Sequence, residues 1–98
     1  METHQTLYQN ESRAVTLTIL DQDNVAFTTI DSVTYTVENV SESVIVTSTA
    51  ATVSSNTMTA VIGTTVTANI GDYFIIWKIT DTDGYIYYHK TALEVLSI

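Results

Sequence analysis

The strongest constraint on the fold is an alternation of apolar and polar side chains with a period of two residues. It is clearest over residues 73–80, where one face would carry Tyr73, Ile75, Trp77 and Ile79. Alternate side chains share a face in a β-strand, whereas a helix brings together residues three or four apart. The alternation recurs in residues 12–20, 33–38 and 57–62. The chain is therefore predicted to be all-β.

Composition agrees with a single β domain. The 98 residues include no proline and three glycines, and Thr, Val and Ile dominate. Such β-branched residues suit the pleated, half-buried surface of a sheet. The spacing of the runs and of the turn residues between them predicts a two-sheet β-sandwich of about seven antiparallel strands. Residues 12–98 are assigned to this sandwich, and residues 1–11 to an N-terminal arm or edge strand.

The last two predicted strands form a hairpin whose register can be derived from its turn. Gly84, at the end of the turn 81–84, can supply the positive φ that a type I turn with a bulge requires. This turn places Asp81 opposite Tyr85 and therefore Trp77 opposite His89. A slip of one residue would bury Lys90, which is costly. The register predicts a core face that includes Tyr87 and Leu93.

The opposite face of the hairpin is also apolar, and the residues responsible are Phe74, Ile76 and Tyr88. Exposed apolar patches of this kind usually mark contact sites. Leu7 and Tyr8 are the sizeable apolar side chains of residues 1–11, and we expect them to extend the contact. The predicted interface residues are therefore Phe74, Ile76, Tyr88, Leu7 and Tyr8.

Charge narrows the classes of partner. Three basic residues stand against eleven acidic ones, a formal net charge of −8. An acidic surface repels phosphate, so neither nucleic acid nor an anionic membrane is expected as a partner. The N-terminal residues lack the basic segment and apolar run of a secretory leader, so a protein made and left in the cytoplasm is expected.

Candidate metal and catalytic residues are few. Asp21 with Asp23, and Asp81 with Asp83, offer carboxylate oxygens for Ca²⁺, but the spaced ligand series of a calcium loop is missing, which favours turn formation. His4 and His89 without cysteine do not make a zinc site. The sequence also lacks a nucleophile motif of the G-x-S-x-G type. We therefore expect no catalytic residues, no cofactor and no enzyme activity.

Two features resemble a known family. The segment Asn69-Ile70-Gly71-Asp72-Tyr73 resembles the tyrosine corner of immunoglobulin-like sandwiches. The wider layout is similar to small immunoglobulin-like domains of bacteriophage structural proteins, including the N-terminal domain of phage baseplate upper proteins. The matching stretches are residues 8–12, 16–24, 30–37, 71–77 and 83–84.

This resemblance implies an immunoglobulin-like fold and a non-enzymatic structural role in the virion. A single small domain fits an auxiliary or decoration protein, or a connector component, of the phage head. Its expected partners are further copies of itself, giving a homo-oligomer, or a major capsid, connector or tail protein. The alternatives are a tail or baseplate component, a module that binds host glycans or receptors through loops 21–31, 41–43 and 63–70, and a calcium-stiffened tail spacer.

Overall fold

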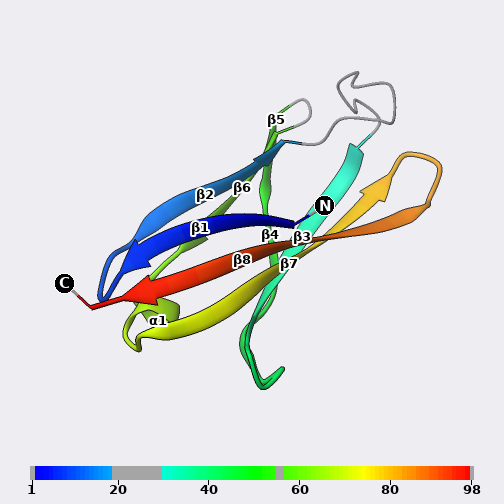
Figure 1. Cartoon of the computed structure of the whole chain (residues 1–98). Coiled ribbons are helices and arrows are strands. Elements are labelled where there is room, and N and C mark those ends of the chain that lie inside the picture. The colour runs from blue at the N-terminus through cyan, green and yellow to red at the C-terminus, as the bar shows by residue number, and fades with distance from the viewer. Residues whose placement is uncertain (1, 19–29, 55–56, 98) are drawn as a thin grey trace.

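A computed structural model describes residues 2–18, 30–54 and 57–97 of the chain. These residues form eight strands and one short helix (Figure 1). The elements in chain order are β1 Glu2–Tyr8, β2 Arg13–Thr18, β3 Ile30–Asn39, β4 Val44–Ala50, β5 Thr52–Ser54, β6 Thr57–Ile62, α1 Thr64–Thr67, β7 Gly71–Asp81 and β8 Ile86–Leu96. The prediction of an all-β chain is confirmed at this level.

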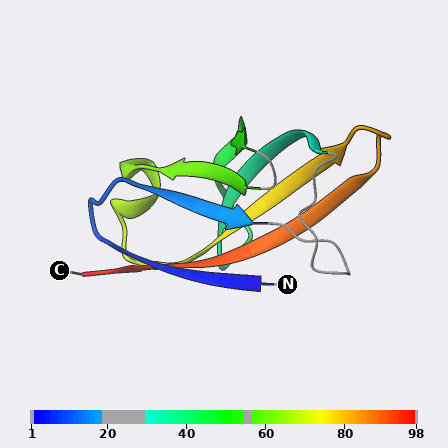
Figure 2. The ribbon, with the colours of Figure 1, turned by 90° about the horizontal axis from the view of Figure 1, so that it is seen from above.

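The strands form two sheets. One has five strands in the order β1-β8-β7-β3-β4, and the other has three in the order β2-β6-β5. Seen from above, β2 and β6 lie in a layer apart from β1 and β8 (Figure 2). This two-sheet arrangement is compatible with the predicted β-sandwich.

One part of the predicted topology is wrong. β1 runs parallel to β8, with Thr3 opposite Thr91 and Leu7 opposite Val95, so the strands are not all antiparallel. The reason lies in the connections. β1 continues into β2, which belongs to the other sheet, so no hairpin turn forces β1 to run against its neighbour. The described strands also number eight rather than about seven, because β1 and the three-residue β5 both count as strands.

The core lies between the two sheets and follows the alternation of the strands. β2 and β6 contribute Val15, Leu17, Met58, Ala60 and Ile62 from the small sheet. The large sheet contributes Leu7, Val33, Tyr35, Val37, Tyr73, Ile75, Trp77, Ile79, Leu93 and Val95, and Val66 of α1 completes the cluster. Removing this apolar surface from water is the main stabilising term of such a fold.

Trp77 is the largest side chain of the core and is fully buried. Its ring centroid lies 6.0 Å from that of Tyr35, and its indole Nε1–H donates a hydrogen bond to Thr91 Oγ1 at 2.9 Å. The indole N–H therefore has a partner inside the core, which a buried donor requires.

Thr91→Val is expected to lower the free energy of unfolding by about 1–3 kcal/mol, because it leaves the Trp77 N–H buried without an acceptor. Urea unfolding of the variant measures this loss. Thr91→Ser is the control, since it keeps the hydroxyl and should retain most of the stability. A Val variant as stable as the wild type would show that this hydrogen bond contributes nothing.

The hairpin between β7 and β8 has the predicted register. Trp77 pairs with His89, Ile79 with Tyr87 and Tyr73 with Leu93. In the turn, Gly84 has a φ of 89° and its N–H donates to the Asp81 carbonyl at 3.1 Å. The left-handed backbone at Gly84 costs little only because glycine lacks a Cβ.

Candidate binding face

One face of the five-stranded sheet packs against the three-stranded sheet, and we call the opposite face the outer face. Strand alternation and cross-strand pairing assign its members. On the three central strands they are Ser32, Thr34, Thr36 and Glu38 of β3, Asp72, Phe74, Ile76, Lys78 and Thr80 of β7, and Ile86, Tyr88, Lys90, Ala92, Glu94 and Leu96 of β8. No strand of the described chain covers this face, because the three-stranded sheet packs against the opposite, inner face of the five-stranded sheet.

The outer face carries the predicted apolar residues close together. Phe74 and Ile76 are half-buried and Tyr88 is 65% exposed. Ile76 lies directly opposite Lys90, whose Nζ sits 4.8 Å from the centroid of the Phe74 ring. A cation over an aromatic face is weakly attractive, and the lysine stem shields part of the ring from water. Phe74, Ile76 and Tyr88 therefore form one apolar patch across β7 and β8.

Leu7 and Tyr8, the two predicted interface residues of the N-terminal segment, differ in their exposure to solvent. Leu7 is fully buried in the core, which corrects its assignment to the interface, because pairing with β8 turns its side chain inward. Tyr8 is 50% exposed and lies opposite Leu96, at the edge of the outer face. Only Tyr8 of this pair offers a surface to a partner.

Charges on the outer face are separated along the strands. Lys78 and Lys90 lie nearer the β7–β8 turn, and Asp72, Glu94 and Glu38 lie farther from it. Asp72 and Glu94 are directly opposite each other, an arrangement of like charges that destabilises a sheet. Across the described ranges, the one ion pair is that of Arg13 with Glu11, so none of these five groups forms an ion pair with another described side chain.

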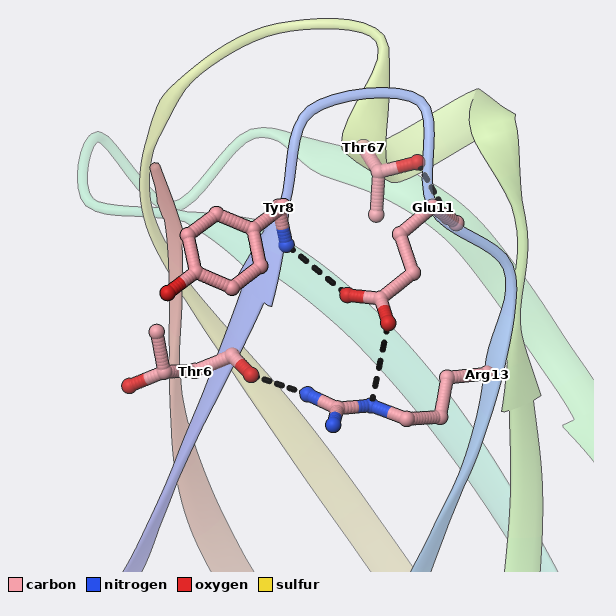
Figure 3. Close-up of polar contacts among 5 residues, drawn as sticks. All are labelled: Thr6, Tyr8, Glu11, Arg13 and Thr67. Atoms are coloured by element: carbon pink, nitrogen blue, oxygen red, sulfur yellow. Dashed lines mark hydrogen bonds and ion pairs between the residues drawn. The ribbon is translucent and has the colours of Figure 1, made fainter. Parts of the chain in front are cut away.

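Arg13, the third basic residue of the chain, makes structural contacts at the turn from β1 to β2 (Figure 3). Glu11 Oε1 accepts a hydrogen bond from Tyr8 N at 2.9 Å, and Glu11 Oε2 lies 3.8 Å from Arg13 Nε. The Arg13 guanidinium also donates to the Thr6 carbonyl, and Thr67 Oγ1 donates to the Glu11 carbonyl at 2.6 Å. These contacts tie β1 to β2 and α1. The shallow hollow at Tyr8 and Glu11 therefore belongs to a structural turn.

The acidic pairs are only partly described. Asp21 and Asp23 lie outside the described residues. Asp81 is 5% exposed, and its Oδ1 accepts hydrogen bonds from the backbone N–H groups of Asp83 and Tyr85, both at 2.9 Å. Its carboxylate thus shapes the hairpin turn, as such side chains commonly do. Among the residues with described structure, no three His, Cys, Asp or Glu side chains are grouped to hold a metal ion.

The assignment of Tyr87 to the core is wrong, because this side chain is 44% exposed. Its hydroxyl donates to Asp81 Oδ2 at 3.3 Å, and desolvation, followed by the Asp81 charge, raises the pKa of the Tyr87 phenol. Alternation gives the face on which Tyr87 lies but not how far the opposing sheet extends over it. Directly after the turn, the hairpin therefore exposes four large hydrophobic side chains in succession, Tyr85 to Tyr88.

The sequence did not identify the acidic end of the outer face as part of the site. The β7–β8 register already placed Asp72 opposite Glu94, but Glu38 joins them only through the pairing of β3 with β7. That pairing joins strands far apart in the chain, and no local turn encodes it.

Comparison with protein-family models finds none that matches the chain, and comparison with curated proteins finds no significant similarity. In the described part of the chain, no helix has the length and apolar character needed to cross a membrane. Function is therefore inferred from the residues and geometry of this chain.

Proposed function

We propose that this chain is a non-enzymatic adhesion domain that assembles with other proteins through its outer face. The observation that carries the proposal is the patch of Phe74, Ile76 and Tyr88 on a sheet whose other face is already filled by the core. A small domain gains little by placing large apolar side chains on a solvated face. It gains a contact site if a partner covers them.

The proposed fold family is immunoglobulin-like, and the strand order supports it. Such sandwiches place strands G, F, C and C′ in one sheet and B, E and D in the other. Here β8-β7-β3-β4 faces β2-β6-β5, which is the same order. Tyr73 near the start of β7 donates its hydroxyl to the Asn69 carbonyl at 2.9 Å, as a tyrosine corner does. One departure is that the buried tryptophan lies on β7 instead of β3.

The proposed setting is a bacteriophage particle, as an auxiliary, decoration or connector component of the head. The resemblance in sequence supports this setting, and the acidic net charge of −8 suits contact with protein rather than with the packaged nucleic acid. The partners would be other copies of the chain or a major capsid, connector or tail protein. Many copies on a lattice make individually weak contacts sufficient. A tail or baseplate position is the alternative within the particle.

Host-surface binding is the second candidate, and the exposed end of the hairpin favours it. Off the outer face, Tyr85 is 66% exposed and Tyr87 44%, and exposed aromatic rings combine a large contact area with a polar tip. In this case the hairpin end, rather than the outer face, would hold a glycan.

Mass spectrometry of purified particles from the source of this sequence tests the proposal. We expect the chain as a multi-copy component that co-sediments with the particle. Absence from particles would contradict the virion role, and clear hits on a glycan array would then favour the host-surface candidate.

A further inference from the structure

The edge strands of the two sheets differ in how well they are protected against pairing with a further strand. The edges are β1 and β4 of the large sheet, and β2 and β5 of the small sheet. On β1, the N–H and the carbonyl of Tyr8 are both bonded to Glu11. The Arg13 guanidinium donates to the carbonyl of Thr6, two residues earlier. Over this part of β1, backbone groups that a new strand would need are already engaged.

β4 and β5 are protected in other ways. The pairing of β4 with β3 contains two register shifts. Such bulges twist an edge strand and interrupt the regular row of backbone donors and acceptors. β5 is three residues long, and very short edge strands are poor templates for pairing. Neither strand therefore offers a flat, continuous edge.

β2 is the edge strand without such protection, and it lies along the upper margin of the molecule in Figure 1. Its six residues pair with β6 in one unbroken register. Residues 14–18 carry no charge. Apart from the β2–β6 ladder, no hydrogen bond within the described ranges ends on a backbone group of these five residues. An edge of this kind is a template for another strand.

We propose that the free edge of β2 pairs with β2 of a second copy of this chain, about a two-fold axis perpendicular to the small sheet. Such an axis reverses the strand direction, so the two β2 strands run antiparallel. The small sheets then join into one sheet in the order β5-β6-β2-β2-β6-β5. This contact lies away from the outer face, so the inference goes beyond the proposed function and does not depend on it.

Strand alternation determines the register of the pair. Val15 and Leu17 are buried toward the core, whereas Ala14, Thr16 and Thr18 are exposed on the other side. Side chains that share a side lie opposite one another in a sheet. The register that pairs all five residues places Thr16 on the axis, opposite Thr16 of the second copy. Val15 then lies opposite Leu17 of the second copy, and Ala14 opposite Thr18.

The properties of β2 explain why a second copy is its partner. Two molecules of net charge −8 repel each other, so they can approach most easily where the surface is neutral. The charged residues nearest to this stretch, Arg13 and Glu11, already form an ion pair with each other. Both β2 strands are extended before they meet, so little conformational entropy is lost on pairing.

The side chains of β2 also suit pairing with themselves. Apolar and Thr–Thr pairs across neighbouring strands stabilise a sheet. A pair of this type already joins β2 to β6, where the hydroxyl oxygens of Thr18 and Thr57 are 3.3 Å apart. The proposed register repeats it with Thr16 on the axis and adds the apolar pair of Val15 with Leu17 twice, as a closed two-fold contact requires.

The axis determines how the dimer presents its outer faces. Rotation about an axis perpendicular to the sheets leaves the direction of each face unchanged, so both outer faces point the same way. A dimer can therefore bind one surface through two outer faces, and linked contacts bind more strongly than single ones. The β2 contact itself is much smaller than a standard interface of about 800 Å² per partner, so a dissociation constant on the order of 0.1 mM is expected.

Disulfide trapping tests the register, because the chain has no cysteine of its own. Thr16→Cys places two thiols opposite each other on the axis, so oxidation should convert most of the protein into a covalent dimer. Ala14→Cys and Thr18→Cys should each cross-link poorly alone, because identical residues lie about 14 Å apart, beyond the reach of a disulfide. A mixture of these two variants should form the covalent heterodimer.

Val61→Cys is the matched control for Thr16→Cys. Val61 is 63% exposed on the same side of the small sheet, but it lies on β6, one strand away from the free edge. We expect it to cross-link at least about 10-fold more slowly than Thr16→Cys. Equal rates for these two variants, or no gain on mixing Ala14→Cys with Thr18→Cys, would overturn the two-fold pairing.

Thr16→Lys tests the pairing without a disulfide. The substitution brings two ammonium groups together on the axis, and lysine is a common protection of natural edge strands. In sedimentation equilibrium of the full chain, we expect this variant to dimerise at least about 10-fold more weakly than the wild type. Val61→Lys, away from the edge, should dimerise as the wild type does. A wild-type chain that stays monomeric up to about 1 mM would overturn the proposal.

The outcomes separate this contact from the outer face. Phe74→Asp changes only the outer face, so its β2 dimer should persist. In the Thr16→Lys background, any remaining assembly is due to the outer face. If the wild type is monomeric and Thr16→Lys still weakens binding to particles, the edge pairs with a strand of another protein and the second copy is refuted as its partner.

Discussion

Phe74→Asp is expected to abolish assembly through the outer face while leaving the domain folded. Phe74 is only half-buried in its own chain, so an aspartate there remains partly solvated in the monomer. In the contact, the same carboxylate would be buried in the middle of the apolar patch, where an unpaired charge is strongly unfavourable. Truncating or charging a central interface residue commonly costs more than 2 kcal/mol, so affinity should fall at least about 30-fold.

Sedimentation velocity measures the assembly of this variant, and thermal unfolding measures its stability. Val61→Asp is the matched control, because Val61 is an exposed residue on β6 of the other sheet and receives the same charge. It should assemble as the wild type does. If Phe74→Asp unfolds the domain, Tyr88→Ser tests the same patch at a side chain that is 65% exposed. Normal assembly of both variants would refute the outer face as a contact site.

Trp77→Ala is expected to lower the free energy of unfolding by about 3–5 kcal/mol. The substitution removes the largest side chain from the centre of the core and leaves a cavity that the rigid sheets close only in part. Small domains have only about 5–15 kcal/mol of stability in total, so the substitution removes a substantial fraction of it.

Urea unfolding of Trp77→Ala and Trp77→Phe separates packing from hydrogen bonding. The phenylalanine variant keeps much of the ring packing against Tyr35 but loses the N–H that binds Thr91, so a loss of about 1–3 kcal/mol is expected. A loss below about 1 kcal/mol in the alanine variant would contradict the placement of Trp77 at the centre of the core.

Local chemistry in the sequence predicts much of this fold. The turn at Asp81 to Gly84 determined the register of β7 and β8, and that register placed Phe74, Ile76 and Tyr88 on one face. The hydrogen bond from Tyr73 to Asn69 likewise occurs within five residues of chain, where the sequence had indicated a corner. Short-range turn geometry and strand alternation were sufficient for these features.

Features that depend on contacts between strands far apart in the chain could not be predicted from the sequence in this way. The parallel pairing of β1 with β8 turns Leu7 into the core, and nothing near Leu7 in the sequence encodes that neighbour. The exposure of Tyr87 depends on the extent of the opposite sheet. Glu38 joins the charged part of the outer face only because β3 lies beside β7. In each case, the deciding contact is made by a segment far away in the chain.

Hydroxyl-radical footprinting of Tyr88 and Tyr85, as the protein is concentrated or bound to particles, tests the role of the outer face most directly. The two side chains are matched, since Tyr88 is 65% exposed on the outer face and Tyr85 is 66% exposed off it. We expect the oxidation rate of Tyr88 to fall several-fold on assembly while that of Tyr85 stays constant. Equal protection of both, or protection of Tyr85 alone, would contradict assembly through the outer face.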